Sequence, residues 1–238
     1  MSEISEVDQS KTEKPRSDSS SEALTVTEEI VLNQLKTRDL PSGVIEGLCR
    51  DHRSLLAKSR KVRVSVVGHP GTPRHLSLPM LRQLFTFDLM QVALMPSVAA
   101  DLRIAAEETL INRLETISIG ERTTLAKRAS GRVAGTLLLD ADVRVMRAAL
   151  ENPRVTEAIV VKSLMNSRST AILIEAVSKH FKWHTRREIQ IALLQNPRTP
   201  IEQALRLARS LPAQVVSDLL AAGRLPGALK ARIRAEAE

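Results

Sequence analysis

A short proline-containing phrase recurs along this chain of 238 residues, and each copy lies between two apolar runs at helical spacing. Residues 150–157 read Leu-Glu-Asn-Pro-Arg-Val-Thr-Glu, residues 194–201 read Leu-Gln-Asn-Pro-Arg-Thr-Pro-Ile, and residues 67–73 read Val-Gly-His-Pro-Gly-Thr-Pro. Pro153 and Pro197 lie 44 residues apart. Pro70 precedes Pro153 by 83 residues, which is close to two such periods. A proline disfavours helical geometry in the residue before it, so each phrase ends a helix. A recurring period of this length predicts a stack of helix pairs.

The runs before the three phrases also align with one another. Val62, Val145 and Ile189 occupy one equivalent position. The positions three and four residues later are small or apolar in every copy, and positions i, i+3 and i+4 share one face of a helix. We therefore expect this face to be buried. At residues 199–202, Thr-Pro-Ile-Glu predicts a helix restart, with Thr199 as the N-cap and proline in the first turn.

Apolar periodicity predicts helices along the rest of the chain and no strand. Residues 62–67 alternate as a strand would, but their alignment with the other two runs favours a helix. Aromatic residues make up 2% of the chain, so its core must be aliphatic, which favours packed helices. The register of residues 98–140, which lack the phrase, stays open. The expected helices span 42–50, 53–67, 74–84, 87–94, 98–115, 121–129, 131–139, 142–151, 156–166, 169–180, 184–195, 200–210, 212–222 and 226–235.

Charge and composition divide the chain into two parts. Residues 1–23 are rich in Ser, Glu, Lys and Asp, which predicts a disordered acidic tail, and residues 24–238 form the expected helical domain. Residues 1–40 hold five basic and nine acidic groups, whereas the remainder holds 30 basic and 18 acidic ones. Such a basic body suits an anionic partner, although a solvated Arg-rich surface explains it as well. One cysteine, no long apolar run and no signal peptide predict a cytoplasmic protein that does not enter a membrane.

The two Asn-Pro runs resemble known repeats. Val145 to Thr156 and Ile189 to Pro200 are similar to bacterial HEAT-like repeats and to the leucine-rich repeat variant, in which an apolar helix ends in Asn-Pro-x-Thr-Pro. Residues 122–153 also resemble an uncharacterised bacterial helical-repeat family, and the likeness covers residues 41–222 in degenerate form. The resemblance implies an all-α, right-handed α-solenoid of HEAT-like helix pairs that binds other macromolecules. It implies no reaction, and a lone Cys49 cannot ligate the iron–sulfur cluster associated with the leucine-rich repeat variant.

Two clusters of side chains are candidates for binding a partner. A tryptophan among basic residues can stack on a base or anchor a protein, or it can be a ring wedged between repeats. A basic stripe needs the solenoid to bring neighbouring units into line, and some of its members are expected to form intramolecular ion pairs. The candidates are Lys127, Arg128, Arg132, Arg144, Arg147 and Arg154 in the stripe, and Lys182, Trp183, Arg186 and Arg187 around the tryptophan.

Sites for chemistry are weakly indicated. His180 and His184 have the i, i+4 spacing of a metal-binding pair, but the pair crosses an expected helix break, and Cys49 near His52 is typical of a buried thiol. We therefore expect no catalytic residue, metal or cofactor. An enzyme like the alkylpurine DNA glycosylases, whose HEAT-like folds need aromatic residues at the site, is disfavoured by one Trp, three Phe and no Tyr.

The prediction is therefore a non-enzymatic helical-repeat scaffold that binds another macromolecule, most often a protein for folds of this kind. The alternative is nucleic-acid binding, RNA or DNA, without sequence reading, through the basic face. The sequence does not indicate an oligomeric state.

Overall fold

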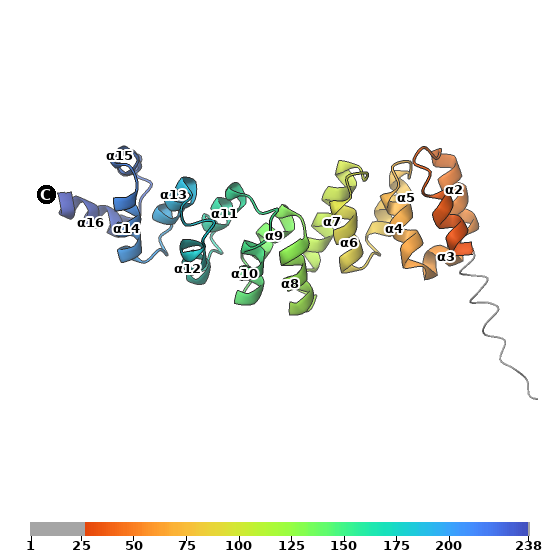
Figure 1. Cartoon of the computed structure of the whole chain (residues 1–238), viewed down its shortest axis with the longest axis horizontal. Coiled ribbons are helices and arrows are strands. Elements are labelled where there is room, and N and C mark those ends of the chain that lie inside the picture. The colour runs from red at the N-terminus through yellow and green to blue at the C-terminus, as the bar shows by residue number, and fades with distance from the viewer. Residues whose placement is uncertain (1–26, 238) are drawn as a thin grey trace, which may run out of the picture. The chain divides into compact units, whose positions relative to one another are not determined.

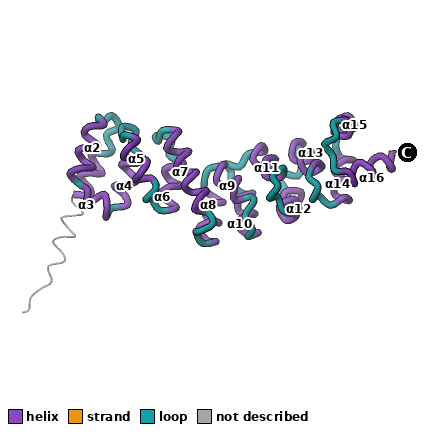
Figure 2. Tube along the Cα trace, turned by 180° about the vertical axis from the view of Figure 1, so that it is seen from behind, coloured by secondary structure: helices purple, strands orange, loops and turns teal. Residues whose placement is uncertain are grey.

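The computed structural model describes residues 27–237, and these residues form helices joined by turns, with no strand among them. Figure 2 shows this alternation along the trace. The prediction of an all-α protein is confirmed, and residues 62–67 lie within helix α4 (Arg60–Gly68). The predicted disordered tail, residues 1–23, lies outside the described residues.

The chain divides into two compact units between Met80 and Leu81. The first contains a helix over residues 27–34, then α2 (Ser42–Asp51), α3 (Arg53–Lys58), α4 and α5 (Arg74–Leu81), whose last residue begins the second unit. Its core holds Val31, Leu35, Ile45, Cys49, Leu55, Leu56, Val62 and Val66. The single helix expected over 53–67 is wrong, because Ser59 leaves helical geometry and its hydroxyl caps α4 by accepting from the Val62 amide at 3.2 Å.

The second unit holds the remaining helices, which run in two rows (Figure 1). In one row α8 packs on α10 and α10 on α12, and in the other α7, α9, α11 and α13 pack in succession. From α6 to α13, the helices thus contact the helices two places along the chain and partners in the other row. The bounds are α6 (Thr86–Leu94), α7 (Ala100–Arg113), α8 (Ile119–Arg128), α9 (Gly131–Leu137), α10 (Val143–Leu150), α11 (Glu157–Leu164), α12 (Ala171–Lys179), α13 (Arg187–Gln195), α14 (Ile201–Ser210), α15 (Ala213–Ala221) and α16 (Gly227–Ala237).

The predicted helix pair of 44 residues is wrong. Three helices, α11, α12 and α13, lie between the Asn-Pro turns at 152–153 and 196–197, so these two turns end helices in different rows. Within one row α8, α10 and α12 begin at residues 119, 143 and 171, which makes the pair 24 to 28 residues long. The Asn-Pro phrase marks only some of the turns, because at the other turns different side chains hold the ends of the helices.

The aligned face is buried, as its spacing predicts. Val62, Val145 and Ile189 are at most 1% exposed. Thr199, in contrast, is not a cap: its hydroxyl donates to the Leu193 carbonyl at 2.6 Å, and Pro200 takes the N-cap position without a side-chain hydrogen bond. The threonine therefore closes the turn behind it and leaves the start of α14 uncapped.

Two glycines of α9, Gly131 and Gly135, let this helix approach α11 closely. A Cβ on Gly135 would lie 2.7 Å from Cγ2 of Ile159, and one on Gly131 would lie 2.5 Å from the carbonyl oxygen of Arg154. Both distances are shorter than carbon atoms tolerate, so the absence of a side chain sets the spacing of the two helices.

Candidate functional site

Side chains in the turns hold the ends of neighbouring helices, and this positions the surface that follows. The buried Asn152 donates from Nδ2 to the carbonyls of Ala126, at 2.7 Å, and Ala129, at 3.1 Å, near the end of α8. Its Oδ1 accepts from the Arg154 amide at 2.8 Å. The last carbonyls of a helix have no partner within the helix, so this one amide both closes its own turn and caps the helix two places back.

The same arrangement recurs at turns with and without the Asn-Pro phrase. Asn196 donates to the Leu164 carbonyl at the end of α11, at 2.5 Å, and accepts from the Arg198 amide at 2.9 Å. In the first unit His69 bonds the Thr37 carbonyl at 2.9 Å. The repeated polar residue therefore supports packing at the turns where, as the sequence predicts, each proline phrase ends a helix.

Trp183 is part of this support. Its side chain is 2% exposed, and the indole N–H donates to the Leu150 carbonyl at the end of α10, at 3.3 Å. The ring thus cannot stack on a base, and of the two interpretations the wedged ring fits. Lys182 places its Nζ 4.1 Å from the ring centroid, whereas Arg186 and Arg187 are exposed at the start of α13.

The predicted basic stripe separates into bound and free cations. Arg154 donates to the Arg128 carbonyl at 3.1 Å, and Arg132 pairs with Glu108 at 3.1 Å and with Glu107 at 3.6 Å. Both guanidiniums therefore hold neighbouring elements together. They lie outside the groove described next, as does the exposed Arg128.

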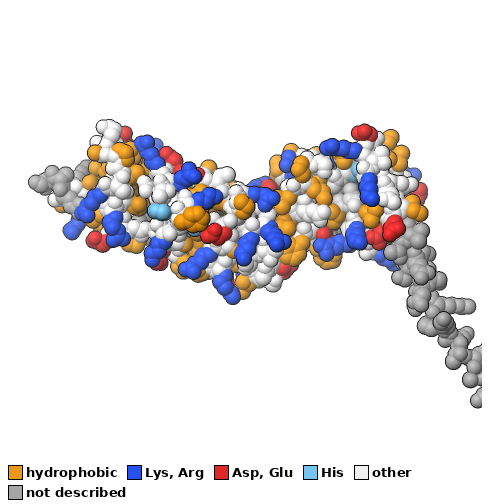
Figure 3. All heavy atoms as spheres, viewed as in Figure 1, with side chains coloured by type: hydrophobic (Ala, Val, Ile, Leu, Met, Phe, Trp, Pro, Cys, Tyr) orange, Lys and Arg blue, Asp and Glu red, His pale blue; other side chains and the backbone are white. Residues whose placement is uncertain are grey.

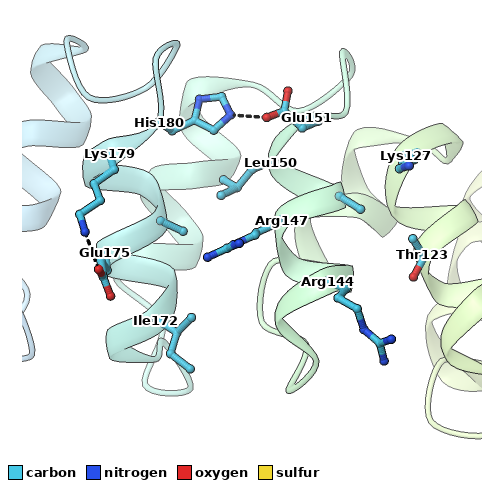
Figure 4. A pocket seen from close by; sticks show the side chains of 12 residues that line it. Thr123, Lys127, Arg144, Arg147, Leu150, Glu151, Ile172, Glu175, Lys179 and His180 are labelled. Carbon is cyan, nitrogen blue, oxygen red and sulfur yellow. Dashed lines mark hydrogen bonds and ion pairs between the residues drawn. The ribbon is translucent and has the colours of Figure 1, made fainter.

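The other three stripe residues meet in a groove. This groove has a volume of about 610 Å³ and crosses α8, α10 and α12 (Figure 4). Figure 3 shows blue Lys and Arg side chains over this part of the second unit, with hydrophobic atoms among them. The groove is lined by Thr123, Lys127, Arg144, Arg147, Ala148, Leu150, Glu151, Ile172, Glu175, Ala176, Lys179 and His180.

Several charges of the groove are already neutralised. Lys179 pairs with Glu175 at 2.6 Å. The Lys182 amide donates to Nδ1 of His180 at 3.2 Å, so Nε2 carries the proton and donates to Glu151 at 3.0 Å. Glu151 is therefore bound to the next turn, and the pair with Arg147 that its i, i+4 spacing allows does not form.

Arg144 is held by a carboxylate outside the groove. It donates through Nε and Nη2 to Asp142, at 3.1 and 2.8 Å, and these side-chain hydrogen bonds, aided by the Arg144 amide, lower the pKa of Asp142 to about 2. Arg147 extends from α10 toward α12, as Figure 4 shows, and its charge contributes to the lowered pKa of Glu175, for which the hydrogen bond from Lys179 is the main cause. Among the described residues Arg147 and Lys127 form no ion pair.

Sequence reasoning missed the α12 side of the groove because it used the wrong period. Arg144 and Ile172, Arg147 and Glu175, and Glu151 and Lys179 each differ by 28 residues, which is the distance from the start of α10 to that of α12. With that register, the i, i+3, i+4 and i+7 positions of α10 and α12 would have been superimposed.

The histidine pair and Cys49, the weaker candidates for chemistry, have the surroundings of structural side chains. Nδ1 of His184 lies 2.9 Å from the His180 carbonyl, and neither ring forms part of a group of three or more metal-ligating side chains within the described residues. Cys49 is 7% exposed, and burial, followed by the Glu46 carboxylate, raises the pKa of its thiol. A raised pKa disfavours the reactive thiolate.

Within residues 27–237, no helix is both long and apolar enough to cross a membrane. Comparisons of the chain with family models, with curated proteins and with solved structures gave no match. The resemblance to HEAT-like repeats therefore stays a prediction, and the candidate site depends on the geometry of the groove.

Proposed function

We propose that this protein is a non-enzymatic, right-handed α-solenoid scaffold that binds another protein through the groove of α8, α10 and α12. The two rows of the second unit support the solenoid, because each helix packs mainly on helices near it in the chain. The observation that carries the binding function is the groove itself, in which Ile172 is 48% exposed and Arg147 forms no ion pair with any described residue. A contiguous surface that is both apolar and charged is typical of a protein-binding site.

The cytoplasm is the proposed location, because the single cysteine is a buried free thiol, as expected in a reducing compartment. Nucleic-acid binding is the second candidate, and the basic charge of the chain favours it. Two observations weigh against it. Trp183 is buried, and Arg132, Arg144 and Lys179 already pair with carboxylates.

Capture from a native lysate with matched surface variants tests the proposal. Ile172 on α12 and Ile104 on α7 are each 48% exposed, so Ile172→Asp changes the groove and Ile104→Asp changes the other row by the same chemistry. We expect nuclease-resistant protein partners that Ile172→Asp loses and Ile104→Asp retains. Partners that nuclease removes, or equal losses in both variants, would contradict the proposal.

A further inference from the structure

We propose that the groove binds an acidic segment of the partner protein, in which carboxylates flank an apolar side chain. The inference rests on the proposed function and names the chemistry of the partner. It depends on the cations of the groove that form no ion pair, on the helices that carry them, and on the apolar side chains beside them.

Among the described residues that line the groove, the cations without an ion pair lie on two neighbouring helices. Four Lys and Arg side chains line the groove against two carboxylates. Asp142 holds Arg144 and Glu175 holds Lys179, so Lys127 on α8 and Arg147 on α10 are the lining cations without an ion pair among the described residues. Both are exposed, so a ligand reaches them without breaking an intramolecular contact.

Apolar atoms lie beside these charges. Ala148 on α10 and Ala176 on α12 line the groove together with Ile172, whose side chain is half exposed. An aliphatic side chain of the ligand that packs on this apolar surface removes it from water, which favours binding. A nucleic-acid backbone supplies anions without an aliphatic side chain, whereas an acidic peptide supplies both.

Within the groove, two cations without an ion pair among the described residues also suit a peptide better than a nucleic acid. Non-specific binding of nucleic acid depends on neutralising many phosphates at once. The other two cations of the groove, Arg144 and Lys179, would have to leave their carboxylates first. A ligand with a few carboxylates needs only Lys127 and Arg147.

Fluorescein-labelled synthetic peptides, titrated into the full chain, test the inference. The probes are a twelve-residue repeat of Glu-Glu-Leu and two matched peptides, Gln-Gln-Leu and Glu-Glu-Ser. We expect the Glu-Glu-Leu peptide to bind most tightly. Exposed ion pairs contribute up to about 1 kcal/mol, so Arg147→Ala and Lys127→Ala should each weaken binding about two- to five-fold. Arg128→Ala is the control, because Arg128 is exposed on α8 but does not line the groove.

Three results would overturn the inference: equal affinity for Gln-Gln-Leu and Glu-Glu-Leu, equal affinity for Glu-Glu-Ser, or an Arg147→Ala variant that behaves like Arg128→Ala. If partner capture still depends on Ile172 in that case, the proposed function stands and only the acidic chemistry fails. A single-stranded oligonucleotide that binds more tightly than Glu-Glu-Leu, and loses affinity in Arg147→Ala, would overturn both.

Discussion

Replacing the buried Asn152 by alanine should destabilise the second unit, because this one side chain bonds both its own turn and the end of α8. Asn152 is 1% exposed and its side chain forms three hydrogen bonds. It donates to the carbonyls of Ala126, at 2.7 Å, and Ala129, at 3.1 Å, at the end of α8, and it accepts from the Arg154 amide at 2.8 Å. A hydrogen bond contributes a net of about 0.5–1.5 kcal/mol, and a buried group left without a partner costs about 1–3 kcal/mol. We expect Asn152→Ala to lower the free energy of unfolding by about 3 kcal/mol.

Asn166 is the matched control. Its Oδ1 accepts from the Arg168 amide at 2.9 Å, the same turn-closing bond that Asn152 makes, but no helix-end carbonyl accepts from it among the described residues. Asn166→Ala should therefore cost about 1 kcal/mol, which is the value of one partly exposed hydrogen bond. The difference between the two variants isolates the cap that Asn152 provides for α8.

Urea unfolding followed by fluorescence measures both variants, because Trp183 is the single tryptophan and is buried against the end of α10. Unchanged denaturant dependence would indicate that the same unit unfolds in each variant. A loss below about 1 kcal/mol for Asn152→Ala, or a loss no larger than that of Asn166→Ala, would refute the reasoning on buried carbonyls.

Three further predictions follow from the geometry. Gly135→Ala should lower the free energy of unfolding by about 1–3 kcal/mol through overpacking against Ile159. The control, Gly47→Ala in α2, should be neutral or stabilising, because a Cβ there meets nothing within 4 Å. Equal shifts of the two variants in thermal unfolding would contradict this. The low pKa of Asp142, about 2, contributes stability above the ordinary value near 3.8 that is lost as pH falls toward 2; Arg144→Ala should return that pKa toward 3.8 in a carboxyl NMR titration, and no change would exclude Arg144 as the cause. Deleting residues 1–23, which hold six acidic and three basic groups, should strengthen binding of acidic peptides at low salt, and an unchanged affinity would show that this charge does not act on the groove.

The sequence determined the helices because helix formation is local. Prolines, apolar spacing and the nearly complete lack of aromatic residues are read within a few turns, and the expected spans match the observed α6 to α16 to within a few residues. The helix expected over 53–67 is the exception: Ser59 interrupts it, and its hydroxyl accepts one hydrogen bond from the Val62 amide, which no periodicity predicts.

Only the tertiary structure decided which helices are neighbours and which charges are free. Asn152 and His180 occupy equivalent turns, 28 residues apart, yet their residue types differ, so proline spacing led to a period of 44 and to the wrong alignment. Likewise Arg132 and Arg147 look alike in the sequence, but the packing of α9 on α7 gives Arg132 its carboxylates and leaves Arg147 without one. Contacts between successive helices of a row depend on three-dimensional register, and a local pattern does not contain it.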